Sequence, residues 1–244
     1  VTCCYLSTIM PPSKRSREAA VTVAYWAIRG LAQPIRLLLE YTGTPYTDKK
    51  YEQGPAPDFD KSCWFDVKDT VLGEYPFPNL PYLIDGDLVV TQSNAIVRHL
   101  ARTSGLLGST TEAAARCDIM LEEGMDLRNR TVGMAYRPPG GDYDGALPAY
   151  EETLRAHLTK CSKYLGSSKW FAGDELTACD FVIYELLDQN ALMVKGVLDA
   201  YSNLKDYHAR FRALPEIAAY LASDRCIVFP CNNQHSHTTQ KKLC

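Results

Sequence analysis

Hydrophobic residues recur from residue 21 onward, first with a strand period and then with a helix period. The apolar run over residues 21–26 predicts a strand, and residues 34–41 repeat apolar side chains at helical spacing with Pro34 in the first turn. Gly43 ends that helix, and residues 46–51 alternate as a second strand. This order predicts a β-α-β unit with parallel strands.

The next stretch predicts a loop, a hairpin and a helix. Residues 52–78 are rich in proline and acidic residues, and we expect an irregular loop there with one helical turn around 62–68. Pro81 opens a strand, Asp85-Gly86 turns it into a second strand, and a helix follows up to residue 102. The resulting order, β-α-β-α-β-β-α, is that of a thioredoxin-like domain.

Beyond this point the pattern is helical. Apolar side chains keep helical spacing over 111–136 and 148–165, and Thr177 with Asp180 has capping-box spacing before a strongly apolar segment. Two shorter helices are predicted over 204–214 and 215–223. The fold class expected is therefore an α/β thioredoxin-like N-terminal domain followed by an all-α C-terminal domain.

These changes of pattern divide the chain into segments. They are an extension at 1–20 that we expect to be disordered, the thioredoxin-like domain at 21–103, a linker at 104–110, the all-helical domain at 111–225, and a tail at 226–244 that lacks periodicity and is expected to be extended.

Charge and composition narrow the partner to a small molecule. The 244 residues carry a formal net charge of -3, and acidic and basic residues are interleaved. This argues against nucleic acid as a partner, and the chain has no polybasic patch for a membrane surface. No apolar run is long enough to predict a membrane span.

Cysteine and histidine usage points to a reduced compartment and to no metal. The nine cysteines are odd in number, scattered and without a CxxC pair, which is typical of reduced cytosolic thiols. Cys117, Cys161 and Cys179 fall in amphipathic segments and are expected to be buried, whereas Cys63 is expected to be exposed. The five histidines do not form a metal set, and no nucleotide-binding motif is present.

Two short segments together predict a cradle for a small acidic peptide. In the first, residues 79–82, the backbone of Leu80 beside Pro81 can pair with an extended ligand. In the second, Gln92 and Ser93 stand where a helix begins, so free N–H groups and the positive end of the helix dipole can hold a carboxylate.

With these motifs in order, the chain resembles a cytosolic glutathione transferase, most closely of the mu class, from about residue 21 to about residue 225. The matching segments are AYWAIRGLAQPIRLLL at 24–39, FPNLPYLIDG at 77–86, TQSNAI at 91–96 and WFAGD at 170–174. Tyr25-Trp26, Trp64 and the long 52–78 loop favour the mu class. The resemblance implies a homodimeric, cytoplasmic enzyme that takes glutathione as co-substrate, conjugates it to small apolar electrophiles, and needs no metal or nucleotide.

The resemblance also assigns roles to individual residues. Tyr25 holds the position of the catalytic tyrosine, whose hydroxyl stabilises the thiolate of glutathione by a hydrogen bond. The residues implied to bind glutathione are Tyr25, Trp26, Leu31, Trp64, Lys68, Asn79, Leu80, Pro81, Gln92, Ser93 and, from a second copy of the chain, Asp126. Tyr136 and Leu31 are implied to face the electrophile, and Phe77 or Tyr75 is implied to insert into the second copy.

The chain departs from the mu-class pattern beside Lys68. Asp66 and Val67 replace an Asn-Glu pair, and two extra residues lie between Lys68 and Asn79, so Asp66 could repel the glycyl carboxylate of glutathione. Two alternatives stay open on this sequence: a glutathione-dependent isomerase, and a non-catalytic ligand-binding or structural relative. The natural electrophile and the role of the tail are not predicted.

Overall fold

The computed structural model describes residues 20–238. The extension predicted at 1–20, apart from Ala20, lies outside the described residues, and so does the end of the tail from residue 239.

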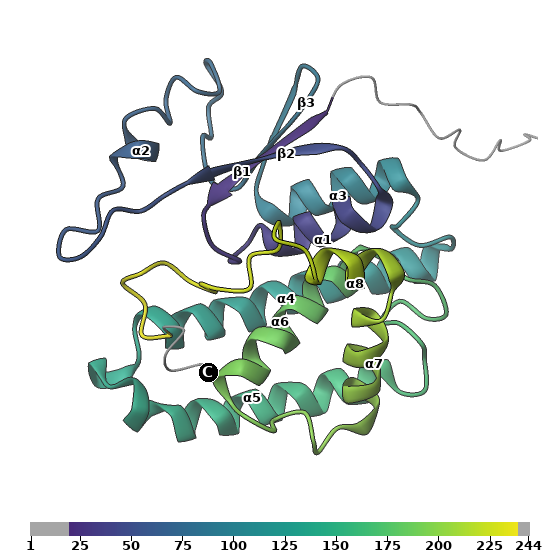
Figure 1. Cartoon of the computed structure of the whole chain (residues 1–244). Coiled ribbons are helices and arrows are strands. Elements are labelled where there is room, and N and C mark those ends of the chain that lie inside the picture. Colours follow the sequence, from purple (N-terminus) through teal and green to yellow (C-terminus); the bar gives the residue numbers. More distant parts are fainter. Residues whose placement is uncertain (1–19, 239–244) are drawn as a thin grey trace, which may run out of the picture.

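The first part of the described chain is built on a four-stranded sheet (Figure 1). Its elements are β1 (Val21–Trp26), α1 (Gln33–Thr42), β2 (Tyr46–Tyr51), α2 (Ser62–Phe65), β3 (Tyr82–Asp85), β4 (Leu88–Thr91) and α3 (Ser93–Ser104). The strand order is β2-β1-β3-β4, with β1 parallel to β2 and antiparallel to β3. The predicted β-α-β-α-β-β-α order and the parallel first pair are confirmed.

Helices α1 and α3 lie between the sheet and the remaining helices, whereas α2 stands apart from them (Figure 1). Apolar side chains on these two helices and on the inner face of the sheet are fully buried, among them Ile35, Leu38, Leu83 and Ile96. Burial of such side chains stabilises the fold by about 1.5–3 kcal/mol each. This packing fixes the C-terminal end of β1, where Tyr25 lies, against the start of α1.

The second part is helical. Its elements are α4 (Thr111–Tyr136), a short 3-10 turn (Pro139–Gly141), α5 (Tyr143–Leu165), α6 (Ala178–Met193), α7 (Ser202–Arg212) and α8 (Pro215–Leu221). Helix α6 runs through the centre (Figure 1), and almost all of its side chains are buried. The capping box predicted at its start is present, with Thr177 as N-cap and Asp180 as its partner.

One helix boundary predicted from the sequence was wrong. The prediction began the second long helix at Pro148, but α5 begins at Tyr143. The Asp142 side chain accepts a hydrogen bond from the Gly145 N–H at 3.1 Å and so caps an earlier turn. Pro148 removes only one backbone donor from the second turn of the helix, and the helix continues through it.

The C-terminal segment folds back onto the body. Residues 226–238 have no helix or strand, as the lack of periodicity predicted, yet Cys231, Asn232, Ser236 and Thr238 are buried. In Figure 1 this yellow segment leaves α8 and runs between the sheet layer and α4. An extended, unpacked tail is therefore the wrong description for these residues.

Candidate active site

The Tyr25 hydroxyl lies where the sheet layer meets the helical part. Tyr25 is the penultimate residue of β1 and is only 5% exposed. Burial raises the pKa of the Tyr25 hydroxyl above its ordinary value, while the charge of Arg128 and a hydrogen bond with the Leu31 backbone act in the opposite direction. The phenol therefore keeps its proton at neutral pH and is available as a hydrogen-bond donor.

Gly30 makes the close approach to Tyr25 possible. Its φ is +42°, and a Cβ at this position would lie 2.6 Å from Tyr25 Cε1 and 2.9 Å from the Tyr25 hydroxyl oxygen. Any larger residue would collide with the phenol ring. The glycine thus lets the loop after β1 turn tightly around the tyrosine.

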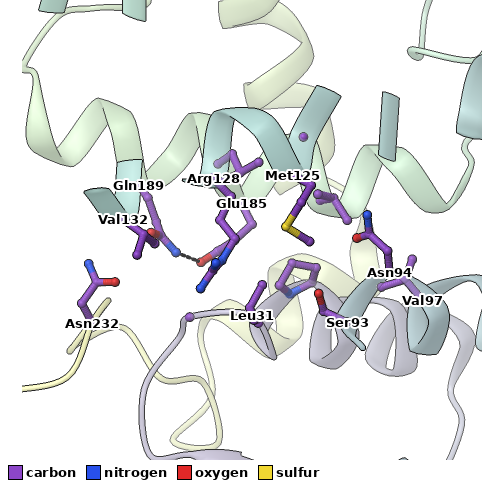
Figure 2. Close-up of a pocket in the computed structure, with 15 residues that line it drawn as sticks. Leu31, Ser93, Asn94, Val97, Met125, Arg128, Val132, Glu185, Gln189 and Asn232 are labelled. Atoms are coloured by element: carbon purple, nitrogen blue, oxygen red, sulfur yellow. Dashed lines mark hydrogen bonds between the residues drawn. The ribbon is translucent and has the colours of Figure 1, made fainter. Parts of the chain in front are cut away.

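Beside Leu31 a narrow cleft lies between the sheet part and the helical part of the molecule. Figure 2 shows Leu31 and Ser93 on its sheet side and Arg128, with Met125 and Val132, on its α4 side. Most of the lining is apolar, and the polar groups converge from four elements. Such a cleft suits a ligand with one polar and one apolar end.

The predicted cradle residues lie at the ends of β3 and α3. The Leu80–Pro81 peptide bond is cis, and the Leu80 N–H donates to Asn79 Oδ1 at 2.9 Å. Gln92 is the exposed N-cap of α3 with φ of 71°, and Ser93 is the first residue of that helix and lines the cleft. The helix begins where the sequence predicted, and its first residue lies at the cleft.

Trp26 and Trp64 lie on the far side of β1 from the helices. Trp64 is 4% exposed, and its ring stands edge-on to the Tyr51 ring at a centroid distance of 5.3 Å. Trp26 is partly buried, and its ring also meets Tyr51 edge-on, at 6.5 Å. Ring packing against Tyr51 thus accounts for the burial of Trp64 without a ligand.

Lys68 lies in the loop after α2. Its Nζ is 6.0 Å from the centre of the Phe65 ring and 3.9 Å from Asp69 Oδ1. Asp66, which was expected to repel the glycyl carboxylate of glutathione, is exposed two residues before Lys68. The acidic residue that meets Lys68 is thus Asp69.

Asp126 and Tyr136 are both on α4 but differ in their surroundings. Asp126 is exposed, beside Asp118 and Glu122 on the outer face of the helix. Tyr136 is the last residue of α4, and its hydroxyl oxygen accepts a hydrogen bond from the Asn233 N–H at 2.7 Å. Burial, together with the nearby Tyr25, raises the pKa of Tyr136 to about 12, so this phenol is also protonated.

Sequence reasoning missed most of the cleft lining, including the polar residues Arg128 and Asn232. Arg128 reaches Tyr25 from α4, and Asn232 enters the cleft from the tail (Figure 2). Arg128 could have been found, because Met125, Arg128 and Val132 have the three- and four-residue spacing of one helix face. No local pattern marks Asn232.

Within residues 20–238 no group of three or more histidine, cysteine, aspartate or glutamate side chains is arranged to hold a metal ion. No helix in the same range is long and apolar enough to cross a membrane.

Comparison with known proteins gives the same family for both parts of the chain. Residues 21–102 match the family model of the glutathione S-transferase N-terminal domain, and residues 125–224 match that of the C-terminal domain. Glutathione S-transferase Mu 1 of Oryctolagus cuniculus is 51% identical over 210 residues, which cover 86% of this chain and 94% of the relative. Glutathione S-transferase Mu 3 of Homo sapiens is 44% identical over 229 residues, which cover 94% of this chain and 100% of the relative.

Solved structures agree. The crystal structure of the glutathione S-transferase Blo t 8 has a TM-score of 0.80 and 31% identity, covering 88% of this chain and 98% of that one. The structure of the Pi-class glutathione S-transferase of Onchocerca volvulus has a TM-score of 0.76 and 28% identity, covering 89% of this chain and 100% of that one. The chain belongs to the glutathione S-transferase family, and within it to the Mu class.

Proposed function

We propose that this protein is a glutathione transferase that conjugates the thiolate of reduced glutathione to apolar electrophiles, with Tyr25 as the activating residue. The observation that carries the proposal is a buried, protonated Tyr25 hydroxyl beside a largely apolar cleft. Family membership supports glutathione as the co-substrate.

The chemical need is an anion at neutral pH. A free thiol has a pKa of about 8.5, so only a few per cent of glutathione is thiolate at pH 7. A hydrogen bond from the Tyr25 hydroxyl favours the charged form and lowers the pKa of the thiol. The thiolate sulfur then forms a bond to the electrophilic carbon, the leaving group departs with its electron pair, and the proton released from the thiol goes to solvent.

For the tripeptide, we assign the sites as the sequence suggested. The helix start at Gln92 and Ser93 holds the γ-glutamyl carboxylate, and Leu80, preceded by Asn79 and followed by Pro81, pairs with the cysteinyl backbone. Trp26 and Leu31 line the binding site, and Trp64 and Lys68 lie toward the glycyl carboxylate. When glutathione binds, the Leu80 N–H exchanges its contact with Asn79 for a contact with the ligand.

For the electrophile, we assign Leu31 and Tyr136. Leu31 offers an apolar contact at the cleft, and Tyr136 keeps its phenolic proton. A protonated phenol can donate to a leaving group or to a developing negative charge.

We further propose that the enzyme is a cytoplasmic homodimer. Phe77 supports this proposal, because its side chain is 71% exposed and suits contact with a second copy. Tyr75 is instead partly buried, and its hydroxyl lies 3.3 Å from Thr91 Oγ1. Phe77 is therefore the better candidate for insertion into a second copy. Asp126, exposed on α4, is free to reach the glutathione site of that copy.

The test is glutathione conjugation to 1-chloro-2,4-dinitrobenzene across pH, with the Tyr25→Phe variant beside wild type. A hydrogen bond to a charged group contributes about 1.5–3 kcal/mol, so kcat/KM near pH 6.5 should fall about 10- to 100-fold and the apparent pKa of the rate should rise.

Tyr164→Phe is the control, because it keeps the ring under Arg116 and lies far from the site. Wild-type turnover by a folded Tyr25→Phe protein would refute the role of Tyr25, and isomerised rather than conjugated products would favour an isomerase.

A further inference from the structure

The C-terminal segment 230–238 is tied to both parts of the molecule around the proposed electrophile site. The Arg29 and Gly30 N–H groups donate to the carbonyls of Pro230 and Cys231, each at 3.0 Å. At the other end, the His237 N–H donates to the Ala135 carbonyl at 2.7 Å. Between these anchors the segment crosses the end of α4, where Tyr136 lies.

Within this span the segment covers Tyr136. The Asn233 N–H donates to the Tyr136 hydroxyl oxygen at 2.7 Å, and the His235 ring lies 4.9 Å from the Tyr136 ring. The same imidazole is 5.9 Å from the ring of Phe59, which belongs to the loop after β2. Gln234 and His235 are exposed, whereas Cys231, Asn232, Ser236 and Thr238 are buried, so the middle of the segment forms an outer cover over Tyr136 and its two ends pack into the body.

One side chain of the sheet part forms hydrogen bonds with two consecutive residues of this cover. Gln53 stands two residues after β2 and is 9% exposed. Its Oε1 accepts the Gln234 N–H at 3.2 Å, and its Nε2 lies 3.2 Å from His235 Nδ1 and from the Phe59 carbonyl oxygen. One glutamine therefore joins the β2 loop to the cover.

The cover is suited to opening without unfolding. Its contacts beside Gln53 are part-buried hydrogen bonds, each of which adds little net stability because water replaces it when it breaks, whereas the anchors at Pro230 and Cys231 lie deeper. The middle of the segment, residues 233–235, is partly or fully exposed, and such stretches open locally before the body does. A bulky ligand beside Tyr136 can thus be admitted when the contacts of Gln53 break.

We propose that Gln53 is a specificity-determining residue that latches segment 230–238 over Tyr136 and thereby limits the size of the electrophile. Small electrophiles react beneath the closed segment, and bulky ones must displace it. This inference rests on the proposed function, because it places the electrophile beside Tyr136.

The test compares two glutathione conjugates, because binding of a conjugate needs no catalysis. S-methylglutathione carries a small group into the electrophile site and S-hexylglutathione a large one. In Gln53→Ala the ratio of dissociation constants should shift toward the hexyl conjugate by about threefold to tenfold, the change expected when two part-buried hydrogen bonds to the segment no longer oppose entry. Affinity for the methyl conjugate should change little.

Glu52→Ala is the matched control, since Glu52 is the exposed neighbour of Gln53 and its side chain makes none of these contacts. Hydrogen exchange of peptides covering 230–238 provides a second measurement, and Gln53→Ala should speed it while leaving α4 unchanged. An unaltered conjugate ratio, or an equal shift in Glu52→Ala, overturns the latch alone. Failure of wild type to bind either conjugate overturns the proposed function and the latch with it.

Discussion

At the scale of single residues, two groups proposed to meet glutathione already have partners in the chain. The Leu80 N–H is held by Asn79, and Lys68 Nζ lies 3.9 Å from Asp69 Oδ1. Both contacts must be exchanged on binding. The Lys68 side chain is 37% exposed and that of Asp69 74%, so their attraction is screened by water and weak.

Asp69 is therefore expected to reduce glutathione affinity slightly. Asp69→Asn should tighten glutathione binding about two- to threefold, because it frees Lys68 and removes a negative charge near the glycyl carboxylate. Lys68→Ala should weaken binding about fivefold. Titration calorimetry with glutathione measures both, with Asp58→Asn, exposed elsewhere in this loop, as control. Equal affinities for Asp69→Asn and Asp58→Asn would show that Asp69 has no specific effect.

At the scale of elements, prediction from sequence succeeded where a single period runs uninterrupted. The bounds of β1, β2 and α4 agree with those predicted, and the helix start at Ser93 lies where the sequence placed it. The role of Tyr25 came from the resemblance and stays a prediction. The tail has no period, and its position depends on contacts such as Asn233 with Tyr136, which are 97 residues apart. Side-chain contacts of this kind leave no mark on the local pattern, and Gln53 and Asn232 were missed for that reason.

The start of α6 gives a prediction at the same scale. Asp180 is fully buried and accepts hydrogen bonds from the Thr177 N–H at 2.8 Å and the Phe171 N–H at 3.0 Å. Asp180→Ala leaves two buried donors unsatisfied and should lower the free energy of unfolding by about 3–5 kcal/mol, measured by urea denaturation.

Asp180→Asn is the informative comparison. Burial raises the pKa of Asp180 to about 6, so the site favours an oxygen acceptor more than it favours a charge. The asparagine variant keeps one oxygen acceptor and should lose less than half of what Asp180→Ala loses. Equal losses in the two variants would mean that the charge, and not the acceptor, stabilises the start of α6.

At the scale of the whole molecule, a buried ion cluster joins the sheet part to the helical part. Arg29, in the loop after β1, donates to Glu185 at 2.9 and 2.7 Å and to Asp188 at 2.7 Å, both on α6. His208 Nε2 of α7 also lies 3.0 Å from Asp188 Oδ1. The loop that carries Gly30 and Leu31 to the cleft is thus fixed to the central helix by charge.

The pKa of Asp188 sets how this attachment depends on pH. Burial acts to raise it, but the hydrogen bond from His208 and the charge of Arg29 outweigh burial and hold the pKa well below its ordinary value. A carboxyl whose folded pKa is depressed adds stability that is fully present above the unfolded pKa of about 3.9. That stability is lost as the pH falls from there toward the folded pKa. The cluster should therefore hold the two parts together at neutral pH and weaken in acid.

Asp188→Asn tests this directly. At pH 7 the variant should lose about 2–4 kcal/mol of unfolding free energy, since Arg29 and His208 stay in place but no longer face the negative charge of Asp188. Below pH 4 the difference in unfolding free energy between the variant and wild type should shrink, because wild type is then losing the stability that ionised Asp188 provides. Urea denaturation at pH 7 and pH 2.5, at one protein concentration, measures both differences. Asp199→Asn is the control: Asp199 pairs with Lys205 at 2.6 Å but is 65% exposed, so its loss should be under about 1 kcal/mol at either pH. A deficit in Asp188→Asn as small as the control's would mean that apolar packing alone joins the two parts. A deficit equally large at both pH values would mean that the shape of the Asp188 side chain, and not its charge, is what α6 requires.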